Sequence, residues 1–166
     1  MDTNLQNLMG ALALALGDAQ THAAEVASGL PASAAAAVVT IGHTPGMTIG
    51  QAARVAGVSH SVMVRIAEGL VARGLMARAV GEDRRAVGLT LTVAGVALRE
   101  AVLAARAAVL ARALAGVDAG ALMPMVVQML TTLTDSRRMA DHMCRLCDEA
   151  LCTDCPVEAQ ALRAAP

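Results

Sequence analysis

Apolar residues recur at helical spacing in the first part of the chain. One face of a predicted N-terminal helix carries Leu5, Leu8, Met9, Leu12 and Leu16. A second helix is predicted to follow Pro31, whose fixed backbone suits the first turn of a helix, and to end near Gly42. The chain is therefore expected to begin with two helices.

The middle of the chain carries the signals of two short helices separated by a tight turn. Thr48 and Gln51 form a capping box, in which each side chain satisfies a free backbone amide at the start of a helix that ends at Gly57. Ser59 caps the next helix, which is predicted to run to about Arg73. Two short helices joined by such a turn form a helix-turn-helix unit.

A hairpin and two long helices are predicted to follow. Residues 75–80 and 86–92 are expected to be strands, because apolar residues alternate along the second segment. Thr92 caps a helix that reaches about Gly116, and Asp118 opens another that is expected to reach the cysteine region. The pattern predicts a mostly α protein with a small β-hairpin wing, the winged helix-turn-helix architecture.

Three of the predicted helices carry broad apolar stripes: the N-terminal helix and the two long C-terminal ones. A single subunit has too little beside them to cover these stripes. Pairing with a second copy through the terminal helices is the simplest arrangement. We therefore expect an intertwined homodimer.

Composition and charge add to this picture. Apolar residues make up 56% of the chain and aromatic residues 0%, so the core must be Leu, Val, Ile, Met and Ala, which favour helices over sheets. The net charge is -1, yet residues 48–92 hold six arginines against three acids (+3) and the remainder holds seven against eleven (-4). A basic segment between acidic ends is typical of a local surface that binds a polyanion.

The uncharged stretch 26–53 does not predict a membrane span, because glycines and prolines interrupt it. We find no positively charged leader before the first apolar run. These features favour a soluble, cytoplasmic protein without a membrane partner.

Several segments in order resemble the MarR family of winged-helix regulators. They are Gly57-Val58-Ser59, Arg65, Leu70, Arg73-Gly74-Leu75, Asp83-Arg84-Arg85, Leu91-Thr92 and Gly95. The resemblance covers residues 30–95 well and the flanking helices by pattern. It implies a homodimer, a recognition helix at residues 59–73, a wing at 75–92, and repression that a ligand or oxidation relieves.

The resemblance and the predicted elements divide the chain into four segments. These are an N-terminal dimerisation helix (1–30), a winged helix-turn-helix DNA-binding domain (31–95), C-terminal dimerisation helices (96–143) and a cysteine-rich tail (144–166).

The first turn of the recognition helix is expected to enter the major groove of double-stranded DNA. The expected contacts are Ser59, His60, Ser61, Val62, Val64 and Arg65 on this helix, with Arg84 and Arg85 at the wing tip. The two valines stand where the family often has small polar residues, and either can pack on a thymine methyl group. The wing arginines suit the minor groove, and a two-fold dimer implies an inverted-repeat operator.

All four cysteines lie in the tail, with the spacing C-x2-C-x4-C-x2-C, and they are Cys144, Cys147, Cys152 and Cys155. Four thiolates complete a tetrahedral zinc site without further ligands, and His142 is a spare donor one turn away. The gap of four residues is short for a zinc ribbon. An iron–sulfur cluster, a thiol redox switch and inert cysteines remain alternatives to zinc. A metal or a disulfide here is expected to change the angle between the subunits.

No paired carboxylates, phosphate loop or nucleophile constellation predicts an enzyme. The favoured function is a DNA-binding transcriptional regulator, more specifically a repressor, that responds to an unidentified small-molecule or metal effector. A thiol-redox or electron-transfer protein that uses the C-x2-C pairs is the alternative, and a winged helix that only joins proteins is a third. Against the redox alternative, Cys144 and Cys147 are expected at a helix C-terminus, where the dipole disfavours a thiolate.

Overall fold

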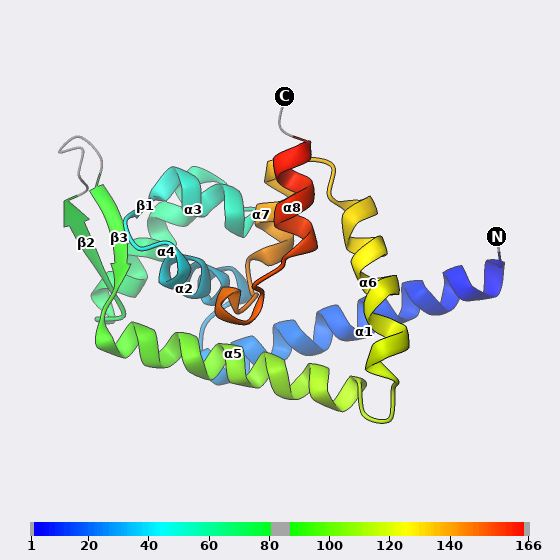
Figure 1. The fold of residues 1–166 in the computed structure, drawn as a ribbon. Helices are drawn as coiled ribbons and strands as arrows, with labels where there is room; N and C mark the ends of the chain where they lie inside the picture. Colours follow the sequence, from blue (N-terminus) through cyan, green and yellow to red (C-terminus); the bar gives the residue numbers. More distant parts are fainter. Residues whose placement is uncertain (1, 81–86, 165–166) are drawn as a thin grey trace.

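The structure, a computed structural model, describes residues 2–80 and 87–164 of the 166-residue chain (Figure 1). The elements in chain order are α1 (Thr3–Ser28), α2 (Ala32–His43), β1 (Met47–Thr48), α3 (Ile49–Ala56), α4 (His60–Ala72), β2 (Met76–Val80), β3 (Val87–Leu91), α5 (Val93–Ala113), α6 (Ala119–Leu133), α7 (Arg137–Cys144), the short 3-10 turn η1 (Glu149–Leu151) and α8 (Pro156–Arg163). The prediction of a mostly helical protein with a small antiparallel sheet is confirmed.

Helix α2 lies at the centre of the helix-turn-helix half of the molecule. It packs against α1, α3, α4, α5 and β3, and residues 34–41 are buried without interruption. One core cluster joins α2 to the two following helices and the sheet, and its largest fully buried members include Ile41, Met63, Leu70 and Leu89. Because so much of α2 is alanine, the neighbouring helices approach its backbone closely.

The predicted caps of the helix-turn-helix unit are confirmed. Thr48 and Gln51 form the capping box at the start of α3, and Gly57 closes that helix with a left-handed backbone (φ 70°). The Ser59 hydroxyl accepts a hydrogen bond from the Val62 amide at the start of α4. These local signals fix the turn between the two helices.

The sheet contains one strand that the sequence pattern did not predict. β1 pairs with β3, which also pairs with β2, so the antiparallel order is β1-β3-β2. A Cβ atom at Gly88 of β3 would lie 2.6 Å from the Gly46 carbonyl oxygen, so only glycine permits this close pairing. Arg84 and Arg85, the predicted wing tip, lie outside the described residues.

The prediction of one continuous helix from Asp118 to the cysteines is wrong. α6 ends at Leu133, and α7 begins after Ser136, whose hydroxyl accepts a hydrogen bond from the Met139 amide. The Thr134 backbone is extended, and its hydroxyl donates to the Leu130 carbonyl. Local side-chain bonds of this kind end a helix without glycine or proline.

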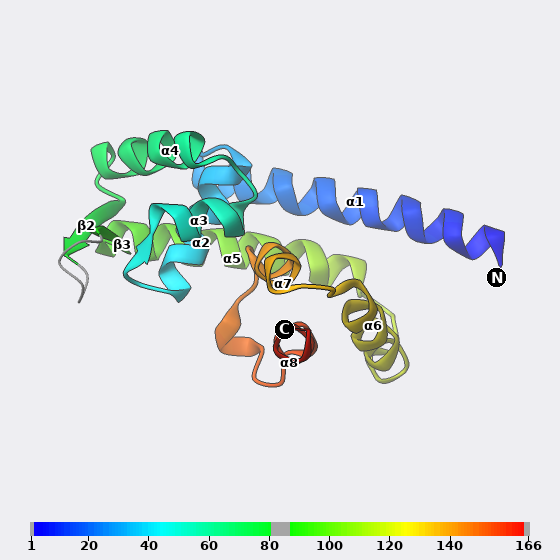
Figure 2. The ribbon, with the colours of Figure 1, turned by 90° about the horizontal axis from the view of Figure 1, so that it is seen from above.

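The C-terminal part has its own small core. Ala140 of α7 packs with Val157 and Ala161 of α8, and Leu130 of α6 lies against them. A separate cluster joins α1, α2 and α5 through Ala24, Val39, Val102 and their neighbours. Figures 1 and 2 show α1 running along α5, with its N-terminal part reaching past the rest of the chain.

Among the described helices, no single one is both long and apolar enough to cross a membrane.

We predict that Gly95→Ala destabilises the protein. A Cβ atom at Gly95 would overlap the Leu75 carbonyl oxygen, so the start of α5 must move away from the backbone that precedes β2. We expect the free energy of unfolding to fall by roughly 1–3 kcal/mol, measured by urea denaturation with circular dichroism at 222 nm. Gly69→Ala is the matched control: that Cβ meets no atom within 4 Å, and the change should stabilise α4 by up to about 1 kcal/mol. Equal effects of the two changes would contradict the packing.

Candidate functional site

The outward face of α4 carries short polar side chains and an arginine. Ser61 and Arg65 are exposed, whereas Met63 on the opposite face is fully buried. The Ser59 hydroxyl lies 3.1 Å from the Ser61 hydroxyl, and the Arg65 Nε lies 3.5 Å from the Ser61 carbonyl oxygen. His60 is exposed at the same end of the helix. The structure therefore brings four of the predicted contact residues to one exposed helix end.

The two valines lie on the flanks of this face. Val62 and Val64 are both half-buried. Val62 borders a groove of about 440 Å³ that Leu30 and Pro31 also line. Each valine therefore offers only part of its side chain to a ligand.

Further arginines surround the helix-turn-helix unit. Arg54 of α3, Arg73 at the end of α4 and Arg78 of β2 are all exposed. All three belong to the basic segment 48–92, and none was among the predicted DNA contacts. They extend the positive surface from α4 towards the sheet.

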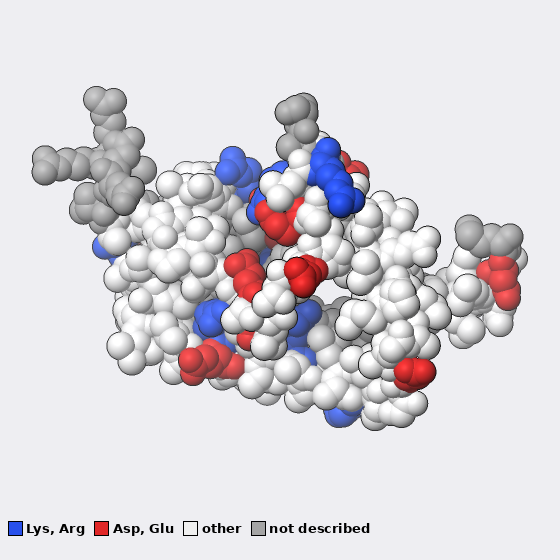
Figure 3. Space-filling model, viewed as in Figure 1, with Lys and Arg blue, Asp and Glu red and all other residues white. Residues whose placement is uncertain are grey.

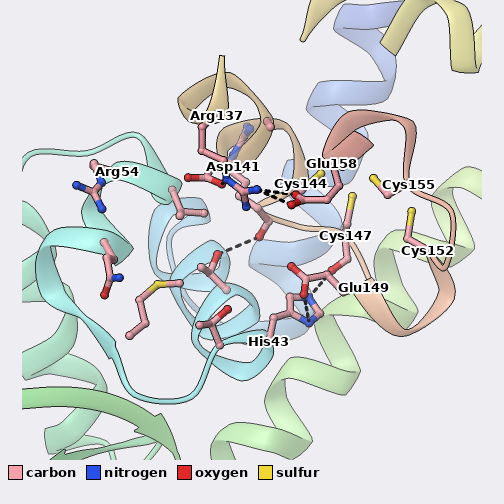
Figure 4. Close-up of a pocket in the computed structure, with 17 residues that line it drawn as sticks. His43, Arg54, Arg137, Asp141, Cys144, Cys147, Glu149, Cys152, Cys155 and Glu158 are labelled. Carbon is pink, nitrogen blue, oxygen red and sulfur yellow. Dashed lines mark hydrogen bonds and ion pairs between the residues drawn. The ribbon is translucent and has the colours of Figure 1, made fainter. Parts of the chain in front are cut away.

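A cavity of about 570 Å³ lies between the helix-turn-helix unit and the C-terminal tail (Figure 4). On the helix-turn-helix side its wall is formed by residues of α2 and α3, among them Thr40, His43, Gln51, Arg54 and Val55. On the other side it is formed by residues of α7 and the segment after it, including Asp141, Glu149, Glu158 and all four cysteines. A ligand in this cavity would contact both parts of the chain.

Three hydrogen bonds join the tail to α2 and α3. The His43 Nε2 lies 2.6 Å from the Cys147 carbonyl oxygen, and the Thr40 hydroxyl donates to the Arg145 carbonyl oxygen at 3.4 Å. The His142 Nδ1 lies 3.2 Å from the Val55 carbonyl oxygen at the end of α3. The His142 ring thus faces the helix-turn-helix unit and not the thiols, so the predicted spare metal donor is engaged elsewhere.

The His142 ring also lies against the turn between α3 and α4. A Cβ atom added at Gly57 would lie 2.7 Å from the ring Cε1 atom. The left-handed backbone of Gly57 and this close contact both require glycine at the position. The tail therefore touches the backbone three residues before α4 begins.

The four cysteines come from four successive points of the tail. Cys144 ends α7, Cys147 follows a turn in which its amide donates to the Cys144 carbonyl at 2.8 Å, Cys152 follows η1, and Cys155 precedes α8. Their thiols interact in pairs, 144 with 147, 144 with 155, and 152 with 155. Figure 4 shows the sulfur atoms turned towards one region. All four are free thiols, and only that of Cys152 belongs to an exposed residue.

As the side chains stand, no three His, Cys, Asp or Glu donors within residues 2–80 and 87–164 surround a point that could hold a metal ion. The cysteines therefore lie near one another without forming a closed metal site. The prediction of a bound metal stays a prediction.

Comparison with known proteins identifies the helix-turn-helix part. Residues 28–86 match the model of the MarR family. Among curated protein sequences, no significant match is found.

Solved structures share the fold over most of the chain. A transcriptional regulator (MarR family) from Rhodococcus sp. RHA1 is 22% identical over 79% of this chain and 97% of its own, with a TM-score of 0.63. The Mycobacterium tuberculosis MarR family protein RV2887, in complex with p-aminosalicylic acid, is 27% identical over 75% of this chain and 96% of its own (TM-score 0.56). CouR from Rhodococcus jostii RHA1, bound to p-coumaroyl-CoA, is 21% identical over 78% and 92% (TM-score 0.61).

The helix-turn-helix part, residues 28–86, is a winged-helix domain of the MarR family, and the chain shares the fold of solved MarR-family structures. The family model ends at residue 86, so the match does not account for the four cysteines.

Two sets of polar contacts hold the tail. Arg137 of α7 donates to both carboxylate oxygens of Glu158 on α8 at 2.6 and 2.8 Å, and to Asp141 at 2.7 Å. The bond to Glu158 is the main reason that the pKa of Arg137 is raised. On the other side, Arg99 of α5 lies 3.0 Å from the His43 ring and 3.7 Å from Asp148. The tail is therefore anchored at both ends.

Two neighbouring thiols have opposite pKa shifts. The hydrogen bond from the Cys144 thiol lowers the pKa of Cys147 to about 6, and the charges of Arg106 and Arg145 act in the same direction. The same bond and burial raise the pKa of Cys144. A thiolate is thus disfavoured at the last residue of α7, as predicted, but favoured three residues later, because arginines and a thiol donor face it.

His43, Thr40 and Arg99 were not predicted to be functional residues. The structure places all three at the junction between α2, α5 and the tail. No local sequence signal reveals them, because Thr40 and His43 bond to residues more than 100 positions away and Arg99 lies 56 positions from His43.

We predict that Cys147 is the first tail thiol of the reduced, metal-free protein to react with iodoacetamide near pH 7. The thiolate is the nucleophile, and the pKa of Cys147 is lowered to about 6 while the pKa values of Cys144 and Cys152 are raised. The Cys147 rate should rise with pH and reach half its maximum near pH 6. Mass spectrometry of peptides after brief alkylation measures the order. Faster modification of the exposed Cys152 would refute the assignment.

Proposed function

We propose that this MarR-family protein is a transcriptional regulator that binds double-stranded DNA as a homodimer, recognises an inverted-repeat operator and represses transcription. The observation that supports it most is the exposed, arginine-bearing end of α4 on a winged-helix scaffold. Members of the MarR family are transcription regulators and not enzymes.

In this proposal the N-terminal end of α4 enters the major groove. Arg65 reaches a guanine edge or a phosphate, since its planar guanidinium binds two acceptors at once. Ser59, His60 and Ser61 supply short donors at the same end. The half-exposed methyl groups of Val62 and Val64 pack against thymine methyl groups, so a selected operator should be enriched in T at those positions.

The wing is proposed to contact the minor groove. Arg84 and Arg85 belong to the segment between β2 and β3, and exposed Arg78 on β2 continues the positive charge along the hairpin. Long cations on a hairpin suit the focused negative potential of narrow minor grooves.

The dimer is proposed to form through α1, α6 and their neighbours, with a second copy of the chain as the partner. Residues 3–15 of α1 are all exposed, and α6 has no buried residue. The apolar side chains left uncovered there include Leu5, Leu8, Leu12, Leu14, Met123, Met125 and Leu133. Figure 3 shows few charges over α6, whereas acidic side chains gather over the tail. A monomer rarely leaves so much apolar helix surface uncovered.

An effector is proposed to change the affinity for DNA. Two solved relatives were crystallised with organic ligands, p-aminosalicylic acid and p-coumaroyl-CoA. For this chain we propose modulation by an unidentified small molecule or by metal or thiol chemistry at the four-cysteine cluster.

Neutralising the arginines of the proposed interface should weaken DNA binding. We expect Arg65→Ala, and separately Arg84→Ala with Arg85→Ala, to reduce operator affinity at least tenfold, with the salt slope falling by about 0.9 for each lost phosphate contact. Fluorescence anisotropy on an operator selected from random DNA measures both quantities. Arg163→Ala on α8 is the control, because it removes the same charge from an exposed site far from α4. Unchanged affinity in both interface variants would overturn the proposal.

Charged residues on α1 should dissociate the proposed dimer. We expect Leu8→Asp with Leu12→Asp to halve the mass measured by light scattering, and to weaken binding to the full inverted repeat by about 10²-fold, since two linked half-sites are no longer engaged together. Val93→Glu is the control. This residue is 90% exposed, but it is the first residue of α5, at the end of that helix far from the uncovered side chains of α1 and α6. A wild-type chain that is monomeric at micromolar concentration would contradict the dimer.

A further inference from the structure

We propose that Cys144, Cys147, Cys152 and Cys155 bind one zinc-class divalent ion, and that the ion holds the tail against the helix-turn-helix unit of the same subunit and thereby strengthens DNA binding. The regulatory half of this inference rests on the proposed function. The metal site does not.

The four cysteines form the ligand set because they lie together. All four line the same cavity, Cys144 and Cys155 both pack against the core between α7 and α8, and Figure 4 shows the sulfur atoms in one region. The thiols also influence one another in pairs, Cys144 with Cys147 and Cys155, and Cys155 with Cys152. They are brought together by the ion pair of Arg137 with Glu158 and by the small core between α7 and α8. Packing outside the cluster therefore gathers the thiols before any ion is bound.

The contacts favour a single ion over a cluster. At a Zn–S distance of about 2.3 Å, the sulfur atoms of a tetrahedral site stand about 3.8 Å apart, which is close to the contact distance between thiols. An iron–sulfur cluster places each thiolate on its own iron, and the spacing C-x2-C-x4-C-x2-C differs from the usual ferredoxin run. Thiolate ligands select soft or borderline ions such as Zn²⁺.

Binding requires a limited rearrangement. The thiols must lose their protons and turn their sulfur atoms from pairwise contacts towards one centre. The backbone need not unfold, because each cysteine lies at an end or turn of an element, where the side chain has rotational freedom: the end of α7, the next turn, the residue after η1 and the residue before α8. The cavity beside them provides space for this movement.

The turn between the first two cysteines is the link to the helix-turn-helix unit. Its carbonyl groups at Arg145 and Cys147 bond to Thr40 and His43 of α2. Two residues before Cys144, the His142 ring bonds to the end of α3 and covers Gly57. An ion that fixes Cys144 and Cys147 therefore fixes the backbone that contacts α2, the end of α3 and the turn before α4.

This arrangement sets the direction of the effect. With the ion bound, the α3–α4 turn is held in one position. Binding to DNA then costs less conformational entropy, because α4 is already in the orientation that binds. Without the ion the turn after α7 is less constrained, and the binding-competent arrangement is less populated. We expect the metal-free dimer to bind its operator about tenfold more weakly.

The first experiment measures the site without DNA. Reduced, metal-free, full-length protein is titrated with Co²⁺ and then with Zn²⁺, and we expect one ion per chain with thiolate-to-cobalt absorption. The absence of Trp, Tyr and Phe leaves the near-ultraviolet region clear. Cys152→Ser with Cys155→Ser should abolish the absorption. Fewer than about one ion per two chains, an unchanged double variant, an iron–sulfur chromophore, or disulfides in place of metal binding would each overturn the proposal.

The second experiment measures the coupling. Operator affinity is compared between zinc-loaded and metal-free protein, and the expected ratio is about tenfold. His142→Ala should keep one ion per chain and reduce this ratio to about twofold or less, because the contact with Gly57 is removed; Arg163→Ala should keep the full ratio. Equal affinities with and without zinc would overturn the regulatory link. Absence of any specific DNA binding would instead overturn the proposed function, while the stoichiometry from the first experiment would still decide the metal site.

Discussion

The burial of α2 is the constraint on which the rest of the structure depends. A helix buried over residues 34–41 must be covered on every side, and α1, α3, α4, α5 and β3 do so. Without aromatic side chains, the buried part of α2 consists largely of small residues, Ala34 to Ala37 among them. The two polar side chains near its C-terminal end, Thr40 and His43, both find their partners in the tail. The core helix is therefore also the attachment point of the cysteine segment.

Local signals explain which parts of the fold could be predicted. The caps at Thr48, Ser59 and Thr92 act within a few residues, so the sequence located the helix-turn-helix unit and the hairpin. The two-residue strand β1 has too little pattern to be seen, and the helix break at Thr134 depends on side-chain bonds that a helix interior also tolerates. The candidate site divides in the same way. The cysteines are obvious in the sequence, whereas their bonds to α2 join residues more than 100 positions apart.

These long-range contacts change how the tail is understood. From the sequence, an event at the cysteines was expected to alter the angle between two subunits. The structure offers a shorter route inside one subunit, from Cys144 and Cys147 through His142 to the Gly57 turn. Both routes end at α4, but only the second is made of contacts within the described chain. It also gives a reason for the position of His142, which faces α3 instead of the thiols.

The tail does not cover α4. In Figure 2, α4 and α8 lie on opposite sides of the molecule. In the proposed coupling, an ion at the cysteines therefore acts on α4 indirectly, through the contact of His142 with the end of α3. Two acidic side chains of the tail face α2 and α5 instead: Glu149 lies 3.9 Å from His43, and Asp148 lies 3.7 Å from Arg99. They are thus separated from the phosphates that Arg65 is proposed to meet. An acidic tail next to α4 would repel DNA, whereas behind α3 its charge is separated from the interface by the helix-turn-helix unit itself.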